Sequence, residues 1–166
     1  LTQYFYSFPK KDRLKVKFFV CDMWQPYVDM AQIYFPNAKI VIDKYHFTRQ
    51  TGWAIESVRK RLQKTMPQNL RKYFKHSRKL ILTRYHRLSD EKKRECDLML
   101  LYNDDLRKAH YLKEKFYEIC QNPKYSEQRT DFWDWIKEAE SSGIPEFEKC
   151  AKTYRNWSKY ILNAYK

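Results

Sequence analysis

The sequence predicts a small α/β unit followed by a longer all-helical region. Two short apolar runs, residues 16–21 and 38–42, each precede an aspartate, and the segment between them has helical spacing. After residue 45 no further run of this kind occurs, and apolar residues recur every three or four positions. The 166 residues include only two glycines and six prolines, which favours helices over many tight turns. We therefore divide the chain into residues 1–46 and residues 47–166.

The α/β unit is predicted as strand, helix, strand. The first run, VKFFVCD, ends at Asp22, and the second, AKIVI, ends just before Asp43. Pro26 suits the first turn of the helix between them, and Pro36 ends it. Strands joined by one such helix pair in parallel with a right-handed crossover, and we expect both to be buried on both faces. Asp22 and Asp43 then lie at the carboxyl edge of the sheet, where active sites collect in α/β proteins.

Several helices are predicted after this unit. Ser89 has the position of an N-cap, and Asp104 or Asp105 is predicted to cap the next helix. Ser141-Ser142-Gly143 is the clearest turn. The predicted helical segments are residues 47–65, 68–85 (one or two helices), 91–102, 106–120, 132–139 and 144 to the C-terminus.

Charge is concentrated in the basic stretch, which we define as residues 44–94. It contains sixteen Lys and Arg against three acids, whereas the rest of the chain has eighteen against seventeen. Such a concentration favours a polyanionic partner, and we expect DNA, although a solvated basic face is the simpler alternative. The residues that we expect to contact DNA are Arg49, Arg59, Lys60, Arg61, Lys64, Arg71 and Lys72.

Other classes of protein are disfavoured. The sequence has no apolar run of about eighteen residues and no signal-peptide pattern at its start, so we expect no membrane association. Its four cysteines are more than twenty residues apart and form no C-x-x-C pair. Neither a disulfide framework nor a zinc site is indicated, and reduced thiols in the cytoplasm are the expectation.

The residues of the α/β unit resemble a known family. The ordered motifs are Asp22-Met23-Trp24, Pro26-Tyr27, Phe35-Pro36-Asn37-Ala38 and the pair Asp43 and His46. Together they resemble bacterial insertion-sequence transposases of the DDE (two aspartates, one glutamate) class, ISL-three type. Residues 106–119 and 141–157 are also similar to the helical region of that family.

The resemblance implies a partial ribonuclease-H-like core, a βαβ unit, followed by a large helical insertion. Asp22 would be the second of three catalytic, metal-binding carboxylates, with Asp43 and His46 as active-site neighbours. The first aspartate would precede Leu1 and the glutamate would follow Lys166, so the chain would be an internal piece of the enzyme. The parent protein would cut and join DNA phosphodiester bonds with Mg²⁺ or Mn²⁺, in the cytoplasm at the nucleoid. One carboxylate holds such an ion weakly, so we expect no tightly bound metal and no activity in this chain alone.

Other interpretations of the carboxylates and aromatic residues stay open. Asp22 can be a turn or cap residue, Asp43 can cap the following helix, and His46 can be a partly buried side chain with satisfied hydrogen bonds. Trp24, Tyr27 and Trp53 are expected in core or interface packing, with base stacking as the minority interpretation.

Other functions stay open too. The competing function is a non-enzymatic, basic helical module that binds nucleic acid, and a third possibility is a decayed transposase remnant. Because a two-stranded sheet has open edges, we also expect the chain to form homo-oligomers.

Overall fold

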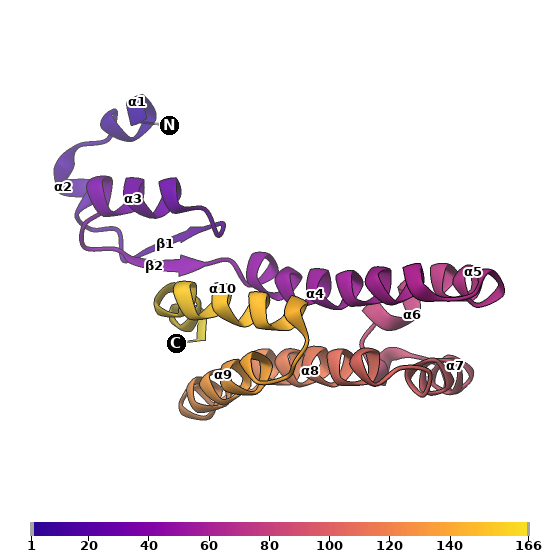
Figure 1. Ribbon diagram of the computed structural model, residues 1–166. Coiled ribbons are helices and arrows are strands. Elements are labelled where there is room, and N and C mark those ends of the chain that lie inside the picture. The colour runs from indigo at the N-terminus through magenta and orange to yellow at the C-terminus, as the bar shows by residue number, and fades with distance from the viewer. Residues whose placement is uncertain (1, 166) are drawn as a thin grey trace. The chain divides into compact units, whose positions relative to one another are not determined.

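The computed structural model describes residues 2–165, which are mostly helical and contain one two-stranded parallel sheet (Figure 1). The chain divides into two compact units. The first unit comprises Leu1–Phe47 and Asn156–Lys166, and the second comprises Thr48–Arg155. The division predicted from sequence was residues 1–46 and residues 47–166. The return of the C-terminal segment to the first unit was not predicted.

In the first unit, β1 (Phe18–Cys21) and β2 (Lys39–Ile42) pair in parallel, as predicted. Their register aligns the last residues, Cys21 and Ile42, and the backbone pairing continues where Asp43 N donates to Cys21 O at 2.9 Å. The connecting helix is α3 (Gln25–Tyr34), with Pro26 in its first turn. The short helices α1 (Thr2–Tyr6) and α2 (Lys10–Arg13) precede β1.

The two faces of this sheet differ in burial. Cys21, Ile40 and Ile42 are buried, whereas Phe18 and Val20 on the other face of β1 are 57% and 60% exposed. The expectation that both faces are buried was therefore wrong for β1. The short helix η2 (Leu162–Tyr165) packs against β2, where Asn163 Nδ2 donates to Ile40 O at 2.8 Å.

The described residues of the second unit form helices joined by short connections, without a strand. Two helices that begin or end in it, α4 (Lys44–Thr65) and α10 (Pro145–Ile161), also contribute residues to the first unit. Between them the chain forms α5 (Gln68–His76), α6 (Arg78–Leu82), η1 (Tyr85–Arg87), α7 (Asp90–Leu100), α8 (Asp104–Gln121) and α9 (Tyr125–Glu140).

The helix caps of the second unit test the sequence predictions directly. Ser89 is the N-cap of α7 and accepts from Lys92 N at 3.4 Å, which confirms that prediction. The N-cap of α8 is Asn103, whose side chain accepts from Leu106 N at 3.1 Å. The prediction of Asp104 or Asp105 was wrong, because both acids lie inside the first turn, where they face the positive end of the helix dipole. Gly143 takes φ +70° in the turn before α10, a conformation that favours glycine.

An aromatic cluster forms the core of the second unit. Phe116 of α8 stacks on Tyr154 of α10 with ring centroids 4.6 Å apart, and Trp135 of α9 lies 4.8 Å from Phe116. Polar atoms in this cluster are satisfied: Trp135 Nε1 donates to Leu112 O at 2.8 Å, and the hydroxyls of Tyr154 and Thr51 are 2.6 Å apart. Packing of these large rings therefore joins α8, α9 and α10, and the hydroxyl contact of Thr51 attaches α4 to them. In residues 2–165 no helix is long and apolar enough to cross a membrane.

Candidate functional site

Asp22 lies at the carboxyl end of β1, and its carboxylate meets a histidine from another element. Nε2 of His46, in the first turn of α4, is 2.9 Å from Oδ1 of Asp22. The two side chains are 31% and 53% exposed respectively, so the carboxylate faces solvent. The strand register explains this contact: it sets Asp43 beside Asp22, and one helical turn then brings His46 over the end of β1.

Asp43 has a local structural role. Its Oδ1 accepts from Tyr45 N at 2.9 Å, and Tyr45 is the second residue of α4. This is the hydrogen bond of an N-cap, so the capping interpretation accounts for Asp43. Asp22 differs from it, because the N-cap position of α3 belongs to Trp24, two residues further on.

These residues do not form a complete metal site. Among residues 2–165, no group of three or more His, Cys, Asp or Glu side chains could hold a metal ion. Asp22 presents a hard oxygen ligand of the type that Mg²⁺ prefers. The thiol of the neighbouring Cys21 would compete poorly for such an ion, because it stays protonated. Burial, and after it the charge of Asp22, raise the pKa of Cys21 to about 11. Asp22 therefore supplies a carboxylate at this edge, but no set of three such ligands surrounds it among the described residues.

Two tryptophans that were expected in core or interface packing are exposed. Trp24 is 55% exposed beside Asp22 and makes an edge contact with Tyr27 at 4.8 Å. Trp53 is 49% exposed on α4, and the guanidinium of Arg49 lies 4.2 Å from the centre of its ring. Neither tryptophan therefore lies in the core, and packing at an interface stays a prediction for both.

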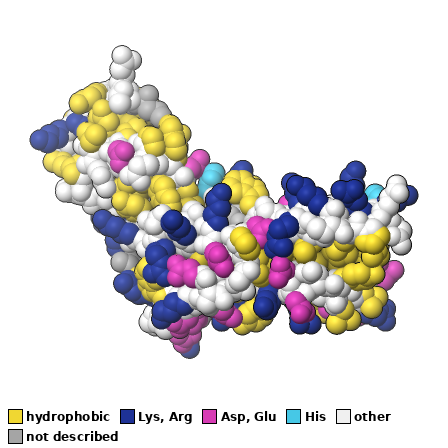
Figure 2. Space-filling model, viewed as in Figure 1, with side chains coloured by type: hydrophobic (Ala, Val, Ile, Leu, Met, Phe, Trp, Pro, Cys, Tyr) yellow, Lys and Arg dark blue, Asp and Glu magenta, His cyan; other side chains and the backbone are white. Residues whose placement is uncertain are grey.

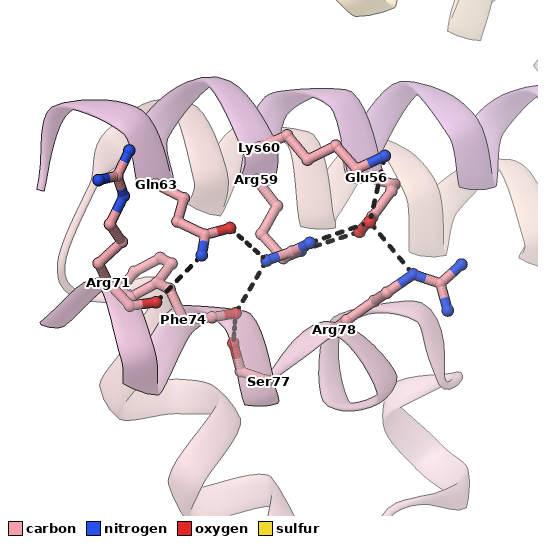
Figure 3. A network of polar contacts seen from close by, with 8 residues as sticks. All are labelled: Glu56, Arg59, Lys60, Gln63, Arg71, Phe74, Ser77 and Arg78. Atoms are coloured by element: carbon pink, nitrogen blue, oxygen red, sulfur yellow. Dashed lines mark hydrogen bonds and ion pairs between the residues drawn. The ribbon is translucent and has the colours of Figure 1, made fainter.

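Arg59, predicted to contact DNA, instead lies inside the second unit. It is 4% exposed, and its Nε and Nη2 donate to the two carboxylate oxygens of Glu56 at 2.8 and 2.9 Å (Figure 3). Its Nη1 donates to Phe74 O at 2.9 Å, which links α4 to α5. Burial alone would raise the pKa of Glu56, but the hydrogen bonds and charges of Arg59 and Arg78 outweigh it and hold that pKa low. We therefore revise the role of Arg59 from surface contact to internal support.

Other arginines of the basic stretch are also paired with acids. Arg61 donates to Glu146 at 2.7 Å and to Asp105 at 3.0 Å, and these bonds, the one to Glu146 foremost, raise its pKa against the opposing effect of burial. Arg84 donates through Nε to Glu114 at 3.0 Å. All three acids follow the basic stretch in sequence. The fold thus neutralises part of the charge that the sequence concentrates.

A smaller group of exposed cations lies at the end of α4 and on α5. We define the basic surface as Lys64 at the end of α4 together with Arg71, Lys72 and Lys75 of α5. All four are exposed, and none has an acidic partner in the described part of the chain. Lys60 is 65% exposed but lies 3.9 Å from Glu56. Figure 2 shows the wider pattern, with Lys and Arg side chains interspersed with acids over the helices of the visible face.

The comparisons place the chain in a family. Residues 1–166 match the family described as transposase, of the DDE class and ISL-three type. The match spans the whole sequence, so the chain belongs to this transposase family, as the motifs around Asp22 predicted. A transposase acts on DNA, which agrees with the partner expected from charge. Neither a curated protein nor a solved structure matches the chain.

Proposed function

We propose that these residues form part of the catalytic domain of a DNA transposase, with Asp22 as a ligand for a divalent metal ion. The observation that carries the proposal is the position of Asp22: a solvent-facing carboxylate at the carboxyl edge of a parallel βαβ unit, held by His46. The first unit would then be a partial ribonuclease-H-like core, and the second unit a helical insertion.

The chemistry explains why a carboxylate is needed there. Bound Mg²⁺ or Mn²⁺ would lower the pKa of a water or 3′-hydroxyl nucleophile and compensate the charge that develops on the phosphate. Asp22 would contribute oxygen ligands from a rigid strand end, since its backbone is fixed by the pairing of Cys21 with the second strand. His46 Nε2 lies 2.9 Å from Oδ1 of Asp22, and a contact to this oxygen would leave Oδ2 for an ion. We therefore assign His46 as a positioning residue.

Two structural observations support this role for Asp22 over a capping role. The carboxylate does not occupy the N-cap position of α3, and its described ion-pair partner comes from a different element. Asp43, one strand away, shows what a capping aspartate does in this fold. The contrast between the two acids separates a candidate ligand from a structural residue.

DNA would be held by the basic surface of the second unit. Lysine and arginine bind phosphates without regard to sequence, so this surface would position DNA and leave sequence recognition to other contacts. The same surface is what a non-enzymatic nucleic-acid-binding module would use, and that function is the second candidate. The two candidates differ in whether Asp22 matters.

The deciding experiment uses the natural protein that carries this sequence. Asp22→Asn keeps the shape of the side chain and removes its charge, so strand cleavage should fall by several orders of magnitude while DNA binding is retained. Asp43→Asn is the matched control, because an asparagine still caps α4. Binding of Mn²⁺, followed by electron paramagnetic resonance, should weaken in the Asp22 variant and not in the control. Retained cleavage by Asp22→Asn would refute the catalytic role and favour the binding module.

A further inference from the structure

A cavity of about 500 Å³ lies in the second unit, between α5, α6, η1 and the start of α7. Its wall includes Tyr73 of α5, Leu80 of α6 and Leu88, the residue after η1. Sites for small molecules and cofactors have volumes of about 300–1,000 Å³. The cavity therefore has room for one small organic group and none for a double helix.

The charge around this cavity favours an anion. Three cations line it, Lys79, Arg87 and Lys92, against the single carboxylate of Glu95. Lys92 Nζ is 2.9 Å from both carboxylate oxygens of Glu95, so these two charges compensate each other. Lys79 and Arg87 are exposed and have no acidic partner among residues 2–165. Two uncompensated cations in the lining match the charge of a phosphate group.

The same cavity offers a surface for a flat ring. Tyr73 is 44% exposed, so part of its ring is open to a ligand. Nucleobases stack on such aromatic side chains with little sequence preference. The side chains of Leu80 and Leu88 add apolar wall to the cavity. Within a duplex, both faces of a base are covered by its neighbours, whereas an unpaired base can stack on protein.

We propose that this cavity binds one unpaired nucleotide of a DNA strand, with its base against Tyr73 and its phosphate on Lys79 and Arg87. The proposal rests on DNA being the partner, as the proposed function has it, and adds a site that distinguishes unpaired from paired DNA. A strand end or a base displaced during strand exchange would present this chemistry.

The test compares a blunt duplex with the same duplex carrying a single-stranded tail, in the absence of divalent metal. The tail carries 2-aminopurine, whose fluorescence reports stacking. The natural protein should bind the tailed duplex about tenfold more tightly, the value of about one stacked base. Tyr73→Ala should abolish this preference and the fluorescence change, whereas Tyr73→Phe should keep both because the ring remains.

Matched controls isolate the site. Tyr111→Ala removes a tyrosine of similar exposure, 53%, that does not line the cavity, and it should keep the preference. Arg87→Gln should reduce the preference, and Arg94→Gln, the same change at an exposed position outside the cavity, should not.

Each failure has a separate meaning. No binding of either duplex would refute DNA binding itself and, with it, the proposed function. Equal affinity for blunt and tailed duplex, or a preference that survives Tyr73→Ala, would overturn the cavity assignment and leave the proposed function standing. Tight binding of free dAMP without any preference for the tailed duplex would also overturn it.

Discussion

His110 makes the second unit sensitive to acid, and the structure gives the size of the effect. The imidazole is 6% exposed on α8, where its Nε2 lies 3.9 Å from Cys96 Sγ. Burial and then the positive charge of Lys113 lower the pKa of His110 to about 4, against the opposing influence of Glu114 and Asp97. Two hydrogen bonds hold the ammonium group of Lys113 near His110: its Nζ donates to Ile81 O at 2.7 Å and to Thr83 O at 3.0 Å.

The sign and magnitude follow from proton linkage. In the unfolded chain the histidine has its ordinary pKa of 6.5, so below that value the unfolded state binds a proton that the folded state excludes. The stabilisation is complete above pH 6.5 and is lost as pH falls toward 4. At about 1.4 kcal/mol per pH unit, this interval corresponds to about 3 kcal/mol of unfolding free energy. A loss of about 3 kcal/mol on acidification is a large part of the total unfolding free energy of an ordinary domain.

The assay is urea unfolding of the chain at pH values from 7.5 to 4.5, for wild type and His110→Gln. Between pH 7.5 and 4.5 the unfolding free energy of wild type should fall by about 2–3 kcal/mol more than that of the variant. This comparison does not depend on how much the two differ in stability at pH 7.5. Ile119→Val on the same helix is the control, since it loses about 1 kcal/mol of packing without removing a titrating group, and its curve should run parallel to wild type. Parallel curves for wild type and His110→Gln would refute the argument from burial.

Three further outcomes are expected. Asp22→Asn should change the thermal midpoint of the chain by no more than about 2 °C, measured by circular dichroism, because its carboxylate is half exposed. Arg59→Ala should destabilise the chain by about 3 kcal/mol in urea unfolding, because it breaks a buried pair with Glu56; a change below 1 kcal/mol would contradict the internal role. Light scattering should show self-association through the open edge and face of β1, and Val20→Lys should reduce it; a monomer at high concentration would count against this.

The parallel βαβ unit could be predicted from sequence because its signals are local. Each strand is a short apolar run, each ends at an aspartate, and the prolines limit the helix between them. Parallel pairing then places Asp22 beside Asp43 without further information. The contact between Asp22 and His46 was less accessible, because it depends on the rotation of α4 after the cap at Asp43.

Long-range neighbours are what the sequence did not reveal. Nothing near Ile40 in the sequence indicates that Asn163 donates a hydrogen bond to its carbonyl oxygen. Nothing near Arg61 indicates that it pairs with Glu146, 85 positions later. The cavity beside Tyr73 likewise needs four helical elements, α5, α6, η1 and α7, to form. In the sequence the cavity is marked only by a tyrosine among lysines, and many solvent-exposed helices have the same pattern.

The neutralisation of the basic stretch leads to a last prediction, on the salt dependence of DNA binding. The slope of log affinity against log salt is about −0.9 for each phosphate neutralised on duplex DNA. If the whole excess of charge in residues 44–94 contacted phosphates, the slope would approach about −12. If contacts are confined to Lys64, Arg71, Lys72 and Lys75, which alone define the basic surface, it should be about −4.

Blunt duplex titrated between about 50 and 200 mM salt measures this slope. The double variant Lys72→Gln with Lys75→Gln should reduce its magnitude by about 2, whereas Lys108→Gln on α8, an exposed lysine outside the surface, should leave it unchanged. A slope near −12 would mean that the paired arginines exchange their carboxylates for phosphates, and the buried position of Arg59 would then not describe the DNA-bound protein. If DNA affinity did not change with salt, the basic surface would be a solvated face that does not contact phosphates.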